Sequence, residues 1–269
     1  MSKEKPILFN TEMVQAILAG NKTMTRRVIK KQPPENSIIH GRVMSSTEPK
    51  NEGCIGWGPN EECVNHYSKM PYEAGEILWV RETWTKYYYV DEDGYTHYDM
   101  PMTYYAADGT PDFSVVDGDG FQLEDQRIKW KPSIHMPRPA ARLFLEITDI
   151  RVERLQDITD EDATAEGIQR LFDDMSDEDY ERWSNNIRCK GFEVGKKEDQ
   201  TWKNYLWHGR DALKQKQVDG WPYQYSSYKT AKESFSSLWH SIYAECGKGW
   251  DVNPWVWVVE FERMDGDSQ

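Results

Sequence analysis

The chain has 269 residues, of which 38% are hydrophobic and 29% are charged, a balance typical of folded globular proteins. No apolar run approaches the length of a membrane-spanning helix, and no signal-peptide stretch opens the chain, so we expect neither a membrane partner nor secretion. Four cysteines do not indicate a disulfide framework, and we therefore expect a cytoplasmic protein.

Charge is distributed unevenly along the chain. The net charge of −13 would by itself argue against a nucleic-acid partner. However, residues 1–31 carry seven Lys or Arg against two acids, whereas residues 91–125 hold ten acids and no Lys or Arg. A binding face responds to its local field, because salt screens exposed charges beyond about 8–10 Å. This pattern fits a basic core with acidic insertions, and it fits a solvated surface of both signs equally well.

The first expected element is a helix capped by Thr11, with an apolar stripe over residues 13–18. Gly20 is suited to end it, because glycine readily adopts the left-handed conformation that follows many helices. Residues 33–71 are rich in Gly, Pro, Asn and Ser without a lasting period, and we interpret them as an irregular insertion.

Two long strands are expected in the middle of the chain. Residues 77–84 are apolar on both faces, which is typical of a covered or closed sheet, and residues 141–152 place Leu143 and Leu145 on one face. Between them, residues 91–125 form an acidic insertion that we expect to consist of hairpins and turns.

A short helix and a third insertion follow. Thr159, with Asp162 three residues later, resembles a capping box, and Gly167 is the expected end of the helix. Residues 169–231 are polar and aromatic with weak helical patterning, which indicates the insertion.

The last two elements complete the predicted fold. Helical spacing of apolar residues predicts a helix over 232–245, and alternation predicts a strand over 255–261. Strands without regular βαβ alternation indicate an α+β fold, a small mixed β-barrel with flanking helices. We expect a single interrupted domain over 1–269, whose core comes from 1–32, 72–90, 126–168 and 232–264 and whose insertions are 33–71, 91–125 and 169–231.

The densest chemical cluster runs from Gly20 to Arg27 and contains a lysine, two threonines and two arginines. Such residues can hold a phosphate or carboxylate through guanidinium and backbone donors. Alternatively, Lys22 beside Arg26 and Arg27 would lose its proton more readily and act as a base toward the Thr25 hydroxyl. A solvated basic loop is the remaining interpretation.

This cluster is similar to the ASCH-domain signature G-x-K-x-x-E-x-R, with Gly20, Lys22 and Arg27 in register and Thr25 where the family usually has Glu. Three further blocks resemble large ASCH proteins of tailed phages and prophages, namely Gly75 to Trp84, Trp130 to Arg138 and Asp251 to Glu262. The resemblance implies a PUA-like β-barrel associated with RNA binding, in a bacterial host or a phage-infected cell.

Thr25 points to a small branch of that family, the amidohydrolases acting on N4-acetylcytidine, which carry K-T-x-T-x-R at this place. That branch uses a lysine, a threonine and a glutamate, which the resemblance places at Lys22, Thr25 and Glu166. Independently, Glu166 lies in the last turn of a short helix, where the helix dipole disfavours an anion. An exposed glutamate in an acidic run is the other interpretation of Glu166.

The resemblance thus implies an amide hydrolysis in which Thr25 attacks the carbonyl, neutral Lys22 accepts its proton, and Glu166 passes a proton to the leaving amine or activates water. Glu82 is an alternative carboxylate. Trp130 could stack on a nucleobase, and most aromatic residues are instead core. The complete set of expected substrate-binding residues is Gly20, Thr23, Arg26, Arg27, Glu82, Trp130, Ser133 and His135.

Cys54, Cys63 and His66 are the strongest candidates for metal ligands. They lack a nearby fourth ligand, since only Cys189 and His40 are available at a distance, so we expect no metal and no cofactor.

Three functions remain open from the sequence. The first is a non-catalytic module that binds RNA or a modified base, and the second is an amidohydrolase acting on an N-acylated cytosine nucleoside. The third is a phage accessory protein that binds a protein partner through its acidic insertions.

Overall fold

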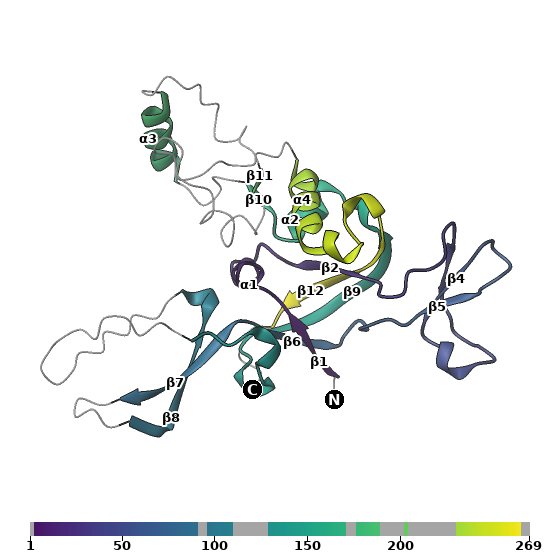
Figure 1. Ribbon diagram of the computed structural model, residues 1–269, viewed down its shortest axis with the longest axis horizontal. Coiled ribbons are helices and arrows are strands. Elements are labelled where there is room, and N and C mark those ends of the chain that lie inside the picture. The colour runs from purple at the N-terminus through teal and green to yellow at the C-terminus, as the bar shows by residue number, and fades with distance from the viewer. Residues whose placement is uncertain are drawn as a thin grey trace, which may run out of the picture. The chain divides into compact units, whose positions relative to one another are not determined.

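The computed structural model describes residues 3–90, 96–109, 129–170, 176–188, 202–203 and 230–264, which form a mixed α+β protein (Figure 1). Its helices are α1 (Thr11–Leu18), α2 (Asp160–Ala165), α3 (Asp177–Arg188) and α4 (Ala231–Tyr243). Its strands are β1 (Glu4–Leu8), β2 (Met24–Val28), β3 (Ile38–Arg42), β4 (Ile55–Gly58), β5 (His66–Ser68), β6 (Ile77–Arg81), β7 (Trp84–Val90), β8 (Thr96–Tyr105), β9 (Phe144–Arg154), β10 (Gln169–Arg170), β11 (Trp202–Lys203) and β12 (Trp255–Arg263).

The strands form separate sheets. Their orders are β1-β6-β9-β12-β2, β3-β4-β5, β7-β8 and β10-β11, and the described residues contain no closed barrel. The chain divides into two compact units, and both are discontinuous in sequence. The first unit contains Met1–Gly20, Ala74–Thr148 and Phe261–Gln269, and the second contains Asn21–Glu73 and Asp149–Glu260.

In the first unit, β1 runs parallel to β6, and β6 pairs antiparallel with the beginning of β9. The expected helix is present as α1, but its cap is Asn10 rather than Thr11, because the Asn10 side chain accepts a hydrogen bond from the Met13 N–H. Gly20 follows the helix with a φ of +78°, as expected for a residue that ends one.

The strand predicted over 77–84 is divided in two. β6 ends at Arg81 and pairs with β9, whereas β7 begins at Trp84 and pairs with β8. The Glu82 N–H between them is directed at the Met136 sulfur instead of a ladder partner. A single apolar run can therefore supply strands to two sheets.

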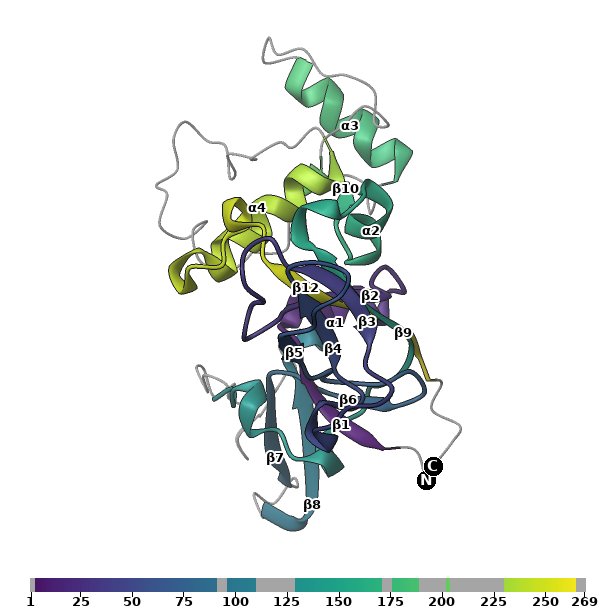
Figure 2. The same cartoon turned by 90° about the vertical axis from the view of Figure 1, so that its right-hand side faces the viewer.

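In the second unit, β2 pairs antiparallel with β12, and α2 and α4 lie side by side in both ribbon views (Figures 1 and 2). Phe235, Leu238 and Trp239 of α4 are buried against Val256 and Val258 of β12. Burial of each large apolar side chain contributes about 1.5–3 kcal/mol, so this cluster holds the helices on the sheet. The predictions of a helix over 232–245 and a strand over 255–261 are confirmed within two residues at each end.

The interpretation of residues 33–71 as irregular is wrong. They contain β3, β4 and β5, which form an antiparallel sheet whose strands are adjacent in Figure 2. Trp57 is fully buried in this region; its indole N–H donates to Ser68, and its ring meets Trp255 edge-on at 4.8 Å between centroids. Strands this short contain too few residues for a two-residue alternation of apolar and polar side chains to be recognised in the sequence.

The other two expected insertions are described in part. β8 lies within residues 91–125, and α3, β10 and β11 lie within residues 169–231, while the remainder of both segments lies outside the described residues. Among the helices that are described, none has the length and apolarity needed to cross a membrane.

Candidate functional site

Lys22 and Glu166, 144 positions apart, meet in the second unit as a buried ion pair. The Lys22 ammonium nitrogen lies 2.7 Å from Glu166 Oε2, and the two side chains are 0% and 5% exposed. The backbone positions the pair, because the Thr23 N–H donates to the Ala165 carbonyl and thereby joins the residues before β2 to the end of α2.

Short-range signals place Glu166 at the end of its helix. The Thr159 hydroxyl accepts from the Asp162 N–H at the start of α2, as the capping box predicted. Glu166 is the C-terminal cap, and Gly167 follows with a φ of +93°. The Ile168 N–H then closes the turn on the Ala163 carbonyl.

The Lys22 ammonium has three hydrogen-bond acceptors around it. It donates to the Met24 carbonyl at 2.8 Å, to the Glu166 carbonyl at 2.8 Å and to Glu166 Oε2. An ammonium has three donor hydrogens, so this geometry satisfies each of them. A buried charge with complete hydrogen bonding can persist in a protein interior, where an isolated one could not.

Burial nevertheless lowers the pKa of Lys22, because desolvation penalises the charged amine. The Glu166 carboxylate opposes that shift, while the positive charges of Arg27 and Arg26 add to it. A proton can pass from Lys22 to Glu166 over one hydrogen bond, which converts the ion pair into a neutral amine and a neutral acid. A buried lysine whose pKa is lowered and which contacts a carboxylate is a recurrent feature of functional sites.

Arg26, an expected substrate-binding residue, is turned into this acidic interior. Its side chain is 0% exposed, and Nη2 lies 2.6 Å from Asp162 and 3.2 Å from Glu153. Nη1 lies 3.6 Å from Glu166 Oε1, the oxygen that Lys22 does not contact. The guanidinium therefore bridges β9 and α2.

Arg151 extends the same network along β9. It donates to Glu153 at 2.5 Å, reaches Asp149 at 3.4 Å and also contacts Glu260 of β12. Asp162, Glu153 and Arg151 were not among the expected site residues. One signal could have found two of them, because Arg151 and Glu153 are two apart on a strand and so share a face.

Thr25 lies on the other face of β2 from Met24 and Arg26, since successive side chains of a strand alternate. It is buried, 3% exposed, and stands opposite Val259 of β12. Arg27 shares the Thr25 face and stands opposite Trp257. The structure thus brings Lys22 and Glu166 together and directs the Lys22 donors elsewhere than at Thr25.

Of the two other expected residues around this loop, Thr23 is exposed and precedes β2, while Gly20 ends α1 in the first unit. The expected residues Glu82, Trp130, Ser133 and His135 also belong to the first unit.

Glu82 forms its own buried ion pair. Arg142 donates to both carboxylate oxygens, at 3.0 and 3.1 Å, and to Asp108 at 2.6 Å. The guanidinium also stacks over the Tyr105 ring at 3.9 Å. Burial raises the pKa of Glu82, and the Arg142 hydrogen bonds oppose that rise.

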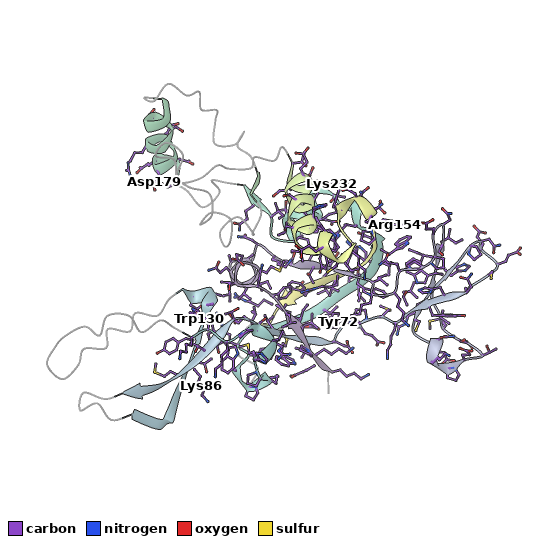
Figure 3. All side chains as sticks on the ribbon, in the orientation of Figure 1. Tyr72, Lys86, Trp130, Arg154, Asp179 and Lys232 are labelled. Atoms are coloured by element: carbon purple, nitrogen blue, oxygen red, sulfur yellow. The ribbon has the colours of Figure 1, made fainter. Side chains whose placement is uncertain are left out.

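Trp130 is partly buried and lies near β7 in Figure 3, next to Lys131, which pairs with Trp84 through the backbone. The Lys131 ammonium sits 4.9 Å from the centre of the Trp84 ring. Ser133 and His135 begin and end a single 3-10 turn, where Ser133 is partly exposed and His135 exposed.

The cysteine and histidine candidates have separate surroundings and do not form a common cluster. Cys54 is buried with its thiol directed at the Lys50 carbonyl, Cys63 is exposed, and a His66 ring nitrogen lies 3.4 Å from the Lys31 carbonyl. The described part of the chain holds no group of three His, Cys, Asp or Glu arranged to bind a metal ion. Cys189 lies outside that part.

Comparison of the chain with protein-family models, with curated proteins and with solved structures found no match.

Proposed function

We propose that the protein is an ASCH-type, PUA-like protein that recognises a modified nucleoside and hydrolyses the amide of an N-acylated cytosine. The observation that carries the proposal is the buried contact between Lys22 and Glu166. Burying two opposite charges contributes little to stability, because desolvation offsets the attraction between them. A role in proton transfer would explain why the chain buries Lys22 and Glu166 in contact although the contact adds little to stability. A cytoplasmic setting, where nucleosides occur, completes the proposal.

In the proposed reaction, Lys22 enters as the neutral amine. The Thr25 hydroxyl attacks the amide carbonyl and gives its proton to Lys22, Lys22 passes that proton to Glu166 over their hydrogen bond, and Glu166 delivers it to the departing exocyclic amine of cytosine. Water then attacks the resulting Thr25 ester, and the carboxylic acid leaves as the Thr25 hydroxyl is restored. Arg27, on the Thr25 face of β2, would hold a carbonyl or anionic group of the ligand.

This reaction requires the Thr25 hydroxyl to come within reach of Lys22 when the ligand binds. Catalytic hydrogen bonds often tighten only in the complex with substrate. The contacts of Lys22 with Met24 and with the Glu166 carbonyl would then have to exchange for one with Thr25.

A specific observation favours a second function, non-catalytic recognition of a modified base or RNA. All three Lys22 donors are already directed at acceptors, and an ammonium held in this way resists deprotonation. The loop around Lys22 would then serve as a rigid frame for binding by neighbouring groups.

Turnover distinguishes the two functions. Purified protein is incubated with a panel of acylated and otherwise modified nucleosides, and the products are identified by mass spectrometry. Under the catalytic proposal, Lys22→Arg reduces deacylation of the cytosine substrate by at least about a hundredfold, because a general base contributes about 10²–10⁴ in rate. Thr25→Ala removes the hydroxyl that attacks the carbonyl, so it should abolish turnover through the Thr25 ester. Guanidinium cannot act as the base near neutral pH.

The matched control is Thr164→Ala, the same substitution at an exposed position of α2. It should retain full turnover. Full hydrolysis by Lys22→Arg and Thr25→Ala would refute the mechanism, and binding without turnover by the wild type would favour the second function.

Salt dependence separates a nucleoside from long RNA as the ligand. A protein that neutralises several phosphates loses affinity steeply as salt rises, because counterions are released on binding. We expect nucleoside affinity to change less than about threefold between about 50 and 200 mM salt, whereas six or more phosphate contacts would cost about a thousandfold.

A further inference from the structure

We propose that Arg26 is a positioning residue whose guanidinium, held by Asp162 and Glu153, orients Glu166 toward Lys22 and sets where their shared proton resides. This inference rests on the proposed function for its catalytic meaning. The effect of Arg26 on the titration of the Lys22 ammonium can be measured without any substrate.

The geometry gives each Glu166 oxygen its own cation. Oε2 accepts from Lys22 at 2.7 Å, and Oε1 lies 3.6 Å from Arg26 Nη1. Oε1 accepts no hydrogen bond from the described residues, so Arg26 acts on it through charge alone, and this attraction favours the orientation in which Oε2 faces Lys22. Asp162 and Glu153 in turn fix Arg26, because a planar guanidinium presents its donors in a rigid fork.

Burial excludes the simpler roles for Arg26. Its side chain is 0% exposed, so it does not anchor a ligand from solvent. It is also not an ordinary surface salt bridge, which contributes about 0–1 kcal/mol and tolerates replacement. A buried guanidinium surrounded by three carboxylates instead adds its positive charge to that of Arg27 in the field at the neighbouring ammonium.

The charges that face Lys22 and Glu166 come from four elements. β2 supplies Arg26 and Arg27, and α2 supplies Asp162. β9 supplies Glu153 and Arg151. Glu260 of β12 contacts Arg151, at one remove from the pair.

Removing the Arg26 charge should make Lys22 keep its proton to higher pH. The repulsion between guanidinium and ammonium disappears, and Asp162 loses its closest cation while Glu153 keeps Arg151, so both changes favour a charged Lys22. Neutral Lys22 then becomes rarer at neutral pH, and the proposed deacylation slows.

The first experiment is a pH titration of the Lys22 ammonium by ¹⁵N NMR, with its signal assigned from its loss in Lys22→Met. A buried ammonium with three acceptors exchanges slowly and remains visible. In Arg26→Met we expect the titration midpoint to move to higher pH than in the wild type, and in Arg26→Lys, which keeps the charge, to stay near the wild-type midpoint. The matched control is Arg182→Met on α3, whose arginine is exposed and pairs with Asp179, and it should not move the midpoint.

Asp162→Asn should move the Lys22 titration midpoint in the opposite direction from Arg26→Met. It keeps Arg26 but removes one of its acidic partners, so the uncompensated positive charge moves the Lys22 midpoint to lower pH. This variant decides the inference if Arg26→Met does not fold. The inference is overturned if the folded variants and the wild type share one Lys22 titration midpoint. It is also overturned if the Lys22 ammonium stays protonated over the same pH range in all of these proteins.

The second experiment is the pH profile of kcat/KM for deacylation. Because neutral Lys22 is the base, the ascending limb should move to higher pH in Arg26→Met, and the rate at neutral pH should fall about tenfold for every whole pH step that the limb moves. Arg26→Lys should restore the limb.

The two experiments distinguish failure of the inference from failure of the proposed function. If the NMR midpoints move as expected but the wild type hydrolyses no nucleoside, the proposed function fails and the effect of Arg26 on the protonation of Lys22 stands. If the wild type is active but the limb stays in place in Arg26→Met, the inference fails and the proposed function stands.

Discussion

Glu82 and Glu166 are both buried carboxylates, and their partners differ in kind. Glu82 is 1% exposed and receives a bidentate pair of hydrogen bonds from Arg142, whose side chain is itself 26% exposed. Glu166 receives a point charge from Lys22 and a more distant guanidinium from Arg26. An amine can exchange a proton with a carboxylate near neutral pH, whereas a guanidinium cannot. This difference is why the Lys22–Glu166 pair, and not the Arg142–Glu82 pair, is the candidate for chemistry.

Glu82 gives a pH-dependent contribution to stability. Burial raises its pKa above the ordinary 4.5, so the folded protein binds this proton more tightly than the unfolded chain does. The free energy of unfolding should therefore fall as pH rises from about 4.5 through the folded-state pKa. Urea denaturation of wild type and Glu82→Gln over this range should show the wild type losing stability relative to the variant. A wild type that gains stability relative to Glu82→Gln would mean that the Arg142 hydrogen bonds outweigh burial.

At the scale of elements, α2 is only six residues long, carries Asp162 and ends at Glu166. An isolated helix of that length is unstable in water, so its caps and its packing must hold it. Thr159 closes its first turn, and Ala163 is buried in the cluster with α4. Lys232, which lies at the start of α4 (Figure 3), donates its N–H to Asp160 and its ammonium to the Gln156 carbonyl. The position of Glu166 thus depends on contacts at both ends of a single short helix.

Thr159→Ala removes the cap of α2 and should lower the free energy of unfolding by about 1 kcal/mol. Thr164→Ala is the matched control, since Thr164 is exposed in the same helix and alanine is the better helix former, so its stability should equal or exceed that of the wild type. Both values come from urea denaturation followed by circular dichroism. Equal losses in the two variants would show that the Thr159 hydroxyl does not cap the helix.

At the scale of the molecule, the net charge of −13 is a source of self-repulsion in the folded state. The ion pairs of Lys22 and Arg26 are buried, and buried pairs are screened by salt much less than exposed charges. Salt should therefore act mainly on the acidic surface.

We expect the melting temperature to rise when sodium chloride is increased from about 20 to 200 mM, because the screening length falls well below the size of the molecule. Differential scanning fluorimetry measures the melting temperature. The control is the same salt series at about pH 5, near the isoelectric point of 5.0, where the rise in melting temperature should be smaller because the net charge is small. A melting temperature that falls with salt at neutral pH would show that attractive surface pairs dominate.

Local signals predicted much of the secondary structure. The Thr159 cap, the end of α2 at Gly167, the apolar stripe of α4 and the strand β12 depend on residues within a few positions of one another. The prediction was wrong where the signal was short, as in β3, β4 and β5, and where one apolar run, residues 77–84, was shared between two sheets. No periodic pattern relates Lys22 to Glu166, because the two residues are 144 positions apart.

By itself the sequence determined the positions of α1, α2, α4, β9 and β12, because capping, turn formation and apolar periodicity act within one or two turns of the chain. The tertiary structure alone decided which charges meet. Thr25 and Arg26 are neighbours in sequence yet face opposite sides of β2, and Arg26 reaches Glu153 and Asp162, which are 127 and 136 positions away. Such contacts follow from the register of β2 on β12 and the docking of α2, and no local pattern encodes either of them, because both depend on packing between distant segments.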